Sequence, residues 1–207
     1  METEVYTRPW APGDLPRLQK AEPSFSARSM TSRFLTGTSR LPLPYVAALR
    51  RPQSRGRAWF GQVALAGGEL VGMAECAWRP DSPRPAELAV LVADRWQRRG
   101  VGRLVVSGLL DEIEAVGMTH IEAVADATNA GCHALARAID RERSGAGGWS
   151  IRSWVTGGHR YLELTRQAGQ TGGPLPTSRR RLEASPGGWV RAGDVAATPA
   201  GLHIRAA

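Results

Sequence analysis

The chain has 207 residues, 42% of them hydrophobic, which is enough for one domain with an appendage or for two small domains. Its formal net charge of +8 comes almost entirely from arginine, since Lys20 is the one lysine, and this bias beside many Ala and Gly residues is typical of genomic base composition rather than of nucleic-acid binding. The two cysteines, Cys76 and Cys132, imply no disulfide framework and fit a reducing cytoplasm, and no apolar run approaches the roughly eighteen residues of a membrane span.

The first half of the chain predicts short helices followed by a β-hairpin. Asp14 follows turn residues and is a candidate N-cap for a helix with Leu15 and Leu18 on one side. Gly67-Gly68 separates two apolar runs and predicts a hairpin turn. The expected elements are strand 5–10, a helix from Asp14, helix 27–35, a brief helix at 45–49, strand 59–66 and strand 70–78.

The second half alternates strands with helices. The continuous apolar run 88–92 predicts a buried strand, and Val101, Val105 and Leu109 recur after it at helical spacing. The expected elements are strand 87–93, helix 101–116, strand 120–125, helix 129–140 and a hairpin of strands 149–155 and 161–164. This order places helices on a sheet that is partly a meander and partly crossover-connected, so the fold class is α/β or α+β.

The polar loop between strand 87–93 and the next helix carries three arginines and two glycines. Glycines leave backbone N–H groups unshielded, and a helix N-terminus presents unpaired N–H donors with partial positive charge, so this junction predicts a phosphate cradle. It is not a P-loop, because no Gly-Lys-Ser/Thr follows. It is not a Rossmann loop either, because Val105 stands where the third glycine is needed and several polar residues separate the strand from Gly100.

What remains is Gln-x-x-Gly-x-Gly, written here as Gln97-Arg98-Arg99-Gly100-Val101-Gly102. This segment resembles the acetyl-CoA pyrophosphate loop of the GNAT superfamily of N-acetyltransferases, and the predicted element order over about residues 3–166 is similar to that fold. A second segment, Ser26-x-x-Ser29-x-x-x-Arg33-Phe34, resembles bacterial GNAT domains related to protein lysine acetyltransferases. The resemblance implies a mixed, mostly antiparallel central sheet flanked by helices, and an acetyl-CoA-dependent N-acetyltransferase.

The resemblance also implies which residues hold acetyl-CoA as a cosubstrate. In the family a main-chain N–H of the strand before the pyrophosphate loop holds the thioester carbonyl, and here that strand is 87–93. The implied contacts are Leu91, Val92 and Ala93 through their backbone, together with Gln97, Arg98, Arg99, Gly100, Val101, Gly102, Arg103 and Asn129.

Glu87 is the candidate general base that takes a proton from the acceptor amine. It begins the strand beside a continuous apolar run, where a carboxylate is partly withdrawn from water, and the resemblance places a catalytic Glu there. The alternative is a Glu at a strand entrance that faces solvent. Glu75 has the next best claim, because its strand also borders the family's acceptor site, and Asp81 and Glu122 are weaker candidates.

The chain departs from the family at the general acid. A Tyr is expected seven residues after Asn129, but that position is Ala136. Either the thiolate leaves unaided, or His133 or Cys132 supplies the proton. The other histidines show no ligand spacing with the cysteines, so no metal site is predicted.

Residues 167–207 are rich in Gly, Pro, Arg and Ser without sustained periodicity, and they predict a mostly disordered tail behind a GNAT domain at 1–166. The predicted function is acetyl transfer to an amine, either a protein lysine or a small molecule, in the cytoplasm and away from membranes, with a homodimer as one option. Two alternatives stay open. One is a non-catalytic acyl-CoA-binding sensor, and the other is a nucleic-acid-binding protein that uses the basic tail, although it lacks an aromatic-basic recognition motif. No acidic cluster that would select a polyamine stands out.

Overall fold

The computed structural model describes residues 4–53, 58–81, 84–145 and 147–166. The strands are β1 (Val5–Pro9), β2 (Ala58–Ala66), β3 (Glu69–Trp78), β4 (Ala86–Val92), β5 (His120–Asp126), β6 (Trp149–Thr156) and β7 (His159–Arg166). They form one seven-stranded sheet in the order β1-β2-β3-β4-β5-β7-β6. β4 and β5 are parallel, and every other neighbouring pair is antiparallel.

The helices of the described residues are α1 (Asp14–Ala21), α2 (Ala27–Phe34), α3 (Leu43–Leu49), α4 (Val101–Ala115) and α5 (Ala130–Arg143), with two 3₁₀ turns, η1 (Glu22–Ser24) and η2 (Asp94–Trp96). The mixed, mostly antiparallel sheet with flanking helices that the sequence predicted is confirmed. α3 begins two residues earlier than expected, at Leu43. Pro44 stands in its first turn. A backbone N–H there has no hydrogen-bond partner within the helix, so a proline without an N–H is tolerated.

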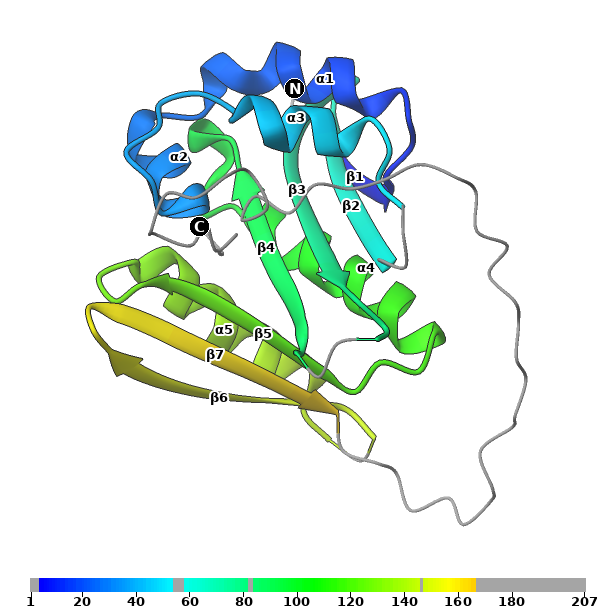
Figure 1. The fold of residues 1–207 in the computed structure, drawn as a ribbon, viewed down its shortest axis with the longest axis vertical. Helices are drawn as coiled ribbons and strands as arrows, with labels where there is room; N and C mark the ends of the chain where they lie inside the picture. Colours follow the sequence, from blue (N-terminus) through cyan, green and yellow to red (C-terminus); the bar gives the residue numbers. More distant parts are fainter. Residues whose placement is uncertain (1–3, 54–57, 82–83, 146, 167–207) are drawn as a thin grey trace.

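The helices cover the two faces of the sheet unequally (Figure 1). α4 and α5 pack on one face, in a core that includes Val105, Leu109 and Leu162. α1, α2 and α3 cover the other face in a second core that includes Phe34 and Leu91 and contains no residue of β5, β6 or β7. The half of this second face that β5, β7 and β6 provide therefore has no helix layer in the described structure. We call it the open face.

β4 and β5 pair only where both begin. Ala86 lies opposite Ile121 and Glu87 lies opposite Glu122, and beyond these residues the two strands spread apart (Figure 1). The main-chain polar groups of β4 beyond Leu88 that point away from β3 therefore have no strand partner in the described sheet. A gap at the carboxyl ends of two parallel strands is a place where α/β sheets bind ligands.

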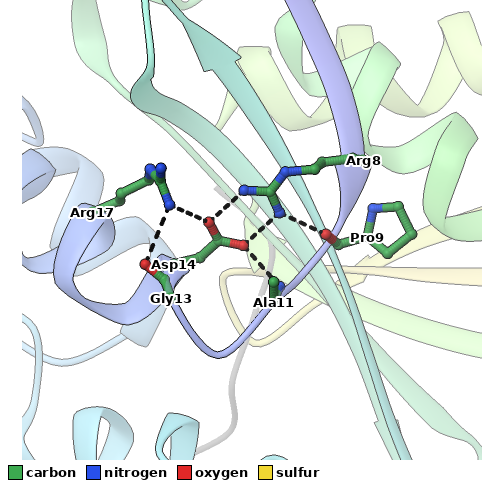
Figure 2. A network of polar contacts seen from close by, with 6 residues as sticks. All are labelled: Arg8, Pro9, Ala11, Gly13, Asp14 and Arg17. Carbon is green, nitrogen blue, oxygen red and sulfur yellow. Dashed lines mark hydrogen bonds and ion pairs between the residues drawn. The ribbon is translucent and has the colours of Figure 1, made fainter.

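Asp14 is not the N-cap that the sequence predicted, because Gly13 occupies that position. The buried Asp14 carboxylate instead accepts two hydrogen bonds of 2.7 Å from the Arg8 guanidinium and one of 2.8 Å from the Ala11 N–H (Figure 2). Arg17 adds a contact of 3.4 Å. Burial raises the pKa of Asp14, but the hydrogen bonds from Arg8 and Ala11 outweigh it and hold the pKa below its ordinary value. The carboxylate thus ties the end of β1 to the start of α1.

The surface and the chain ends add three observations. No helix among the described residues is long and apolar enough to cross a membrane. Lys20 is exposed near the end of α1, and its ammonium lies 3.4 Å from the carboxylate of Glu69. β7, the last described strand, ends at Arg166, and the predicted tail, 167–207, lies outside the described residues.

Candidate functional site

A cleft of about 1110 Å³ opens where β4 and β5 separate. α2 forms one wall, the first half of α5 forms the opposite wall, and the loop between β4 and α4 closes one end. A cleft of this size suits a large ligand. The walls carry mostly small side chains, among them Ala27, Thr31 and Ser32 on α2 and Ala130, Gly131, Ala134 and Ala138 on α5.

The loop between β4 and α4 and the first turn of α4 (residues 93–102), which we call the anion loop, are shaped to hold an anion. Gly100 has φ +85° and directly precedes the helical Val101, and a left-handed residue followed by a right-handed one turns consecutive N–H groups toward one concavity. α4 begins there without a side-chain cap, so the first N–H groups of a 15-residue helix remain for a ligand. Arg98 is also left-handed, with φ +61°, which is uncommon for a residue with a side chain and marks a loop whose shape the fold enforces.

β4 contributes backbone donors to the cleft. The Ala93 N–H donates to the Val71 carbonyl of β3 at 2.9 Å, and successive residues of a strand direct their N–H groups to opposite sides. Leu91 therefore also points its N–H toward β3, whereas Val90 and Val92 point theirs into the gap between β4 and β5. Of the three backbone contacts implied by the sequence, Val92 faces the cleft. Val90, which the sequence did not single out, joins it.

The other predicted cofactor residues fall into two groups. Val101 is buried in the core beneath α4, and the Arg99 guanidinium lies 5.7 Å from the centre of the Trp96 ring. Asn129 caps α5 by accepting a hydrogen bond of 2.9 Å from the Cys132 N–H. The predicted residues that line the cleft besides Val92 are Gln97, Arg98, Gly100, Gly102, Arg103 and Asn129.

The Gln97 side chain is turned toward α2. Its Nε2 donates to the Ser29 hydroxyl at 3.0 Å, and to Asp94 Oδ1 and the Val92 carbonyl at 3.1 Å each. Ser29 in turn donates to Asp94 at 2.7 Å. Burial raises the pKa of Asp94, but hydrogen bonds from Ser29 and Ser26 hold it below its ordinary value. Ser29, Asp94 and Gln97 form what we call the α2 clasp, which fastens one wall of the cleft to the anion loop.

Glu75, the second candidate base, is engaged in a buried ion pair. Its side chain pairs with Arg33 of α2 and accepts a hydrogen bond of 2.9 Å from the Trp59 indole. Glu75 is only 5% exposed. A carboxylate that is enclosed and paired in this way holds α2 onto β3 and is not placed to take a proton from an amine. Asp81, a weaker candidate, is exposed in the loop after β3.

Glu87 is half-buried at the point where β4 and β5 part. It lies opposite Glu122 of β5, and Glu122 lies opposite Glu163 of β7. Side chains at matched positions of neighbouring strands project to the same face, so these three residues form a carboxylate row along the base of the open face. The sequence could not reveal this row, because its members come from strands far apart along the chain.

Basic and aromatic side chains border the carboxylate row. His120 Nε2 lies 3.2 Å and an Arg152 guanidinium nitrogen lies 3.6 Å from the Glu163 carboxylate. These contacts offset part of the negative charge of Glu163. One step further along the strands, the Tyr161 and Trp154 rings stack with centroids 5.7 Å apart and planes within 10° of parallel. The open face therefore offers negative charge beside an aromatic pair of which Trp154 is exposed and Tyr161 half-buried.

Neither predicted substitute for the missing acid lines the cleft. Cys132 is buried, and burial raises the pKa of its thiol to about 11. His133 lies beside Arg137, whose charge, more than burial, lowers the imidazole pKa. The described residues also hold no group of three His, Cys, Asp or Glu side chains that could bind a metal ion.

The cleft fits a phosphate-bearing acyl thioester. The N-terminus of α4, with Arg28, Arg98 and Arg103, offers positive charge to phosphates. The small side chains of α2 and α5 leave a channel for a thin chain, and the N–H groups of Val90 and Val92, which have no strand partner in the described sheet, point into it. The fold and the site together define an acyl-CoA-dependent acyltransferase.

Residues 25–139 match the family model of the acetyltransferase (GNAT) family, which is more than half of the chain. The chain therefore belongs to the GNAT family of acetyl-CoA-dependent N-acetyltransferases.

Solved structures share this fold. The GNAT domain of S. lividans PAT has a TM-score of 0.64 at 21% identity, over 78% of this chain and 90% of that one. The yncA protein of Salmonella typhimurium, solved with its cofactor acetyl-CoA, has a TM-score of 0.60 at 17% identity, over 82% and 98%. The ribosomal-protein-S18-alanine N-acetyltransferase of Escherichia coli has a TM-score of 0.51 at 20% identity, over 81% and 98%. The comparison with curated proteins found no match.

Proposed function

We propose that this N-acetyltransferase acts on an amine that reaches Glu87 from the open face, and that Glu87 is its general base. The observation that carries the proposal is the position of Glu87. It stands half-buried where β4 and β5 part, at the β4 end of the carboxylate row. Glu75, the competing carboxylate, is held by Arg33.

The residues of the site divide the work between binding and proton transfer. Bound acetyl-CoA supplies an acetyl group already activated as a thioester. The Val90 N–H would donate to the thioester carbonyl oxygen and stabilise the negative charge that develops on it. Glu87 would accept the proton of the acceptor ammonium, directly or through a water, as the N–C bond forms and the C–S bond breaks. The sulfur takes a proton from solvent, since neither Cys132 nor His133 lines the cleft.

The open face supports a cationic acceptor. The carboxylate row attracts an ammonium group, and the Trp154–Tyr161 pair offers an apolar surface to the alkyl stem behind it. A protein lysine and a small alkyl amine both have this chemistry, and a face without a helix layer leaves room for a protein. The free, buried thiols of Cys76 and Cys132 support a reducing compartment such as the cytoplasm.

The test is a turnover screen with acetyl-CoA and a panel of amines, with thiol release as the readout. The panel contains lysine-bearing peptides, alkyl diamines and neutral alcohols as negative controls. Calorimetry measures acetyl-CoA binding separately. We expect turnover with a lysine peptide or an alkyl amine. Binding of acetyl-CoA without turnover of any amine would favour the non-catalytic sensor, and absence of binding would overturn both.

A further inference from the structure

A small apolar hollow lies beneath α5, at the deep end of the cleft. Its volume is about 30 Å³, and every side chain around it is apolar or a buried thiol. The walls include Leu88 of β4, Ala123 of β5, and Cys132 and Ala136 of α5. Burial raises the pKa of Cys132 to about 11, so this wall carries no charge at neutral pH. A hollow without polar partners gives a water nothing to bond and favours an apolar occupant.

The hollow adjoins the place where an acyl group would sit. Val90 and Leu135 line both the cleft and the hollow. The Val90 N–H also points into the gap between β4 and β5, where the proposed function places the thioester carbonyl. A carbonyl held there has its alkyl substituent beside the Val90 side chain, next to the hollow.

We propose that the hollow receives the terminal carbon of a propionyl group, so that the site binds propionyl-CoA more tightly than acetyl-CoA. The inference rests on the proposed use of the cleft. A hollow of about 30 Å³ exceeds the roughly 10–15 Å³ that one water-sized group needs, so it has room for about one more carbon. Ala136 leaves this room because its side chain is a single methyl group. A four-carbon acyl chain would have to displace Val90 or Leu135 from a packed wall.

The first test measures the Kd values of CoA, acetyl-CoA, propionyl-CoA and butyryl-CoA by calorimetry on the unmodified full chain without acceptor. We expect propionyl-CoA to bind about fourfold more tightly than acetyl-CoA, the gain that burial of one methylene gives. Butyryl-CoA should bind no more tightly than propionyl-CoA. Equal or weaker binding of propionyl-CoA would overturn the acyl proposal. If no CoA ester binds, the proposed function fails instead.

Two substitutions test whether the hollow sets the preference. Ala136→Val fills it, so the ratio of acetyl-CoA to propionyl-CoA Kd values should fall from about four to one or less, while the acetyl-CoA Kd stays within about twofold. Ala138→Val is the matched control, since Ala138 lies on the same helix and lines the cleft but not the hollow. It should shift all the Kd values together and keep the wild-type ratio.

A third variant covers the case in which Ala136→Val does not fold. Ile139→Val removes one methylene from the wall of the hollow, and this conservative change keeps the helix and most of the packing. Butyryl-CoA should then bind about fourfold more tightly than it binds the unmodified chain. An unchanged butyryl-CoA Kd would show that the hollow is not part of the acyl site.

Discussion

Two glutamates on neighbouring strands lie in different surroundings, and we propose different roles for them. Glu75 is enclosed, and both its oxygens are engaged, one by Arg33 and one by the Trp59 indole. Glu87 stands at the mouth of the gap in the sheet, half-buried and beside another carboxylate at the matched position of β5. The first holds an element in place, whereas the second is accessible to an ammonium proton.

Replacing Glu87 with Gln should lower kcat about 10²-fold, the low end for a positioned general base, because the amide cannot accept the proton. The acetyl-CoA Kd should hardly change, since Glu87 does not line the cleft. Steady-state kinetics and calorimetry check the two halves. Glu69→Gln, an exposed change on β3, is the control and should keep both values. Wild-type turnover of the Glu87→Gln variant would assign deprotonation to bulk water.

The two glycines of the anion loop should respond differently to an added methyl group. Gly100 has φ +85°, where a side chain costs about 1–2 kcal/mol, so Gly100→Ala should weaken acetyl-CoA binding about tenfold as the loop relaxes away from its shape. Gly102 is helical, and a Cβ there would meet Leu135 at an ordinary 3.5 Å. Gly102→Ala should therefore weaken binding much less. Calorimetry on both variants measures the difference, and equal losses would contradict the role assigned to the left-handed turn.

At the scale of elements, α2 is held at two points. Its first turn is joined to the anion loop by the α2 clasp, and its last turn is joined to β3 by the Arg33–Glu75 ion pair. Ser26 caps the helix by accepting a bond from the Ser29 N–H at 3.2 Å, so the Ser29 hydroxyl is left for the clasp. The helix wall of the cleft and the phosphate-binding loop therefore form one unit.

Removing the Ser29 hydroxyl should loosen that unit. Ser29→Ala should weaken acetyl-CoA binding about tenfold, the effect of losing a hydrogen bond to a charged group, and should leave the cap of α2 intact. Ser29→Thr keeps a hydroxyl and should restore most of the affinity. Ser24→Ala serves as control, because the Ser24 hydroxyl donates to the Ala21 carbonyl, outside the cleft. If Ser29→Ala binds acetyl-CoA as the unmodified chain does, the clasp has no part in cofactor binding.

The elements themselves were predictable from the sequence because local rules determine them. Apolar runs gave the strands, Gly67-Gly68 gave the turn, and Asn129 caps α5 at the position where the predicted helix begins. The clasp was not predictable, since its Ser29–Asp94 bond joins residues 65 positions apart. Nor was the fate of Asp14: the same side chain suits a helix cap or an ion pair, and only the fold brings Arg8 beside it.

For the molecule as a whole, the buried Asp14 carboxylate predicts sensitivity to acid. Its pKa is lowered in the folded state, so its stabilising contribution is present above the ordinary carboxyl pKa of about 4 and is lost as the pH falls through the lowered value. Asp14→Asn should cost about 2 kcal/mol at pH 7, the scale of hydrogen bonds to a charged group. Urea unfolding between pH 7 and pH 3 should show a flatter loss of stability for the variant. If the free energy of unfolding falls with pH as steeply in the variant as in the unmodified chain, another group is responsible for the acid sensitivity.

Truncation tests the predicted boundary of the domain. Among the described residues, the last buried member of the two cores is Leu164, and β7 ends at Arg166. Removal of residues 167–207 should therefore change the free energy of unfolding by about 0.5 kcal/mol or less, as surface changes do. Acetyl-CoA should raise the Tm of the full and shortened chains equally, because ligand stabilisation depends on concentration and affinity alone. Insoluble shortened protein would move the boundary into the tail.

The solitary lysine has a practical consequence for an enzyme that acetylates amines. Lys20 is the only side-chain amine in the chain, and every other basic side chain is a guanidinium, which stays protonated and is a poor nucleophile at neutral pH. Acetylation of the enzyme by itself can therefore remove little of the positive charge that attracts its phosphate-bearing cosubstrate. Self-acetylation also contributes little background to an activity assay. Apart from Lys20 and an α-amino group, any acetyl group that accumulates is on the acceptor.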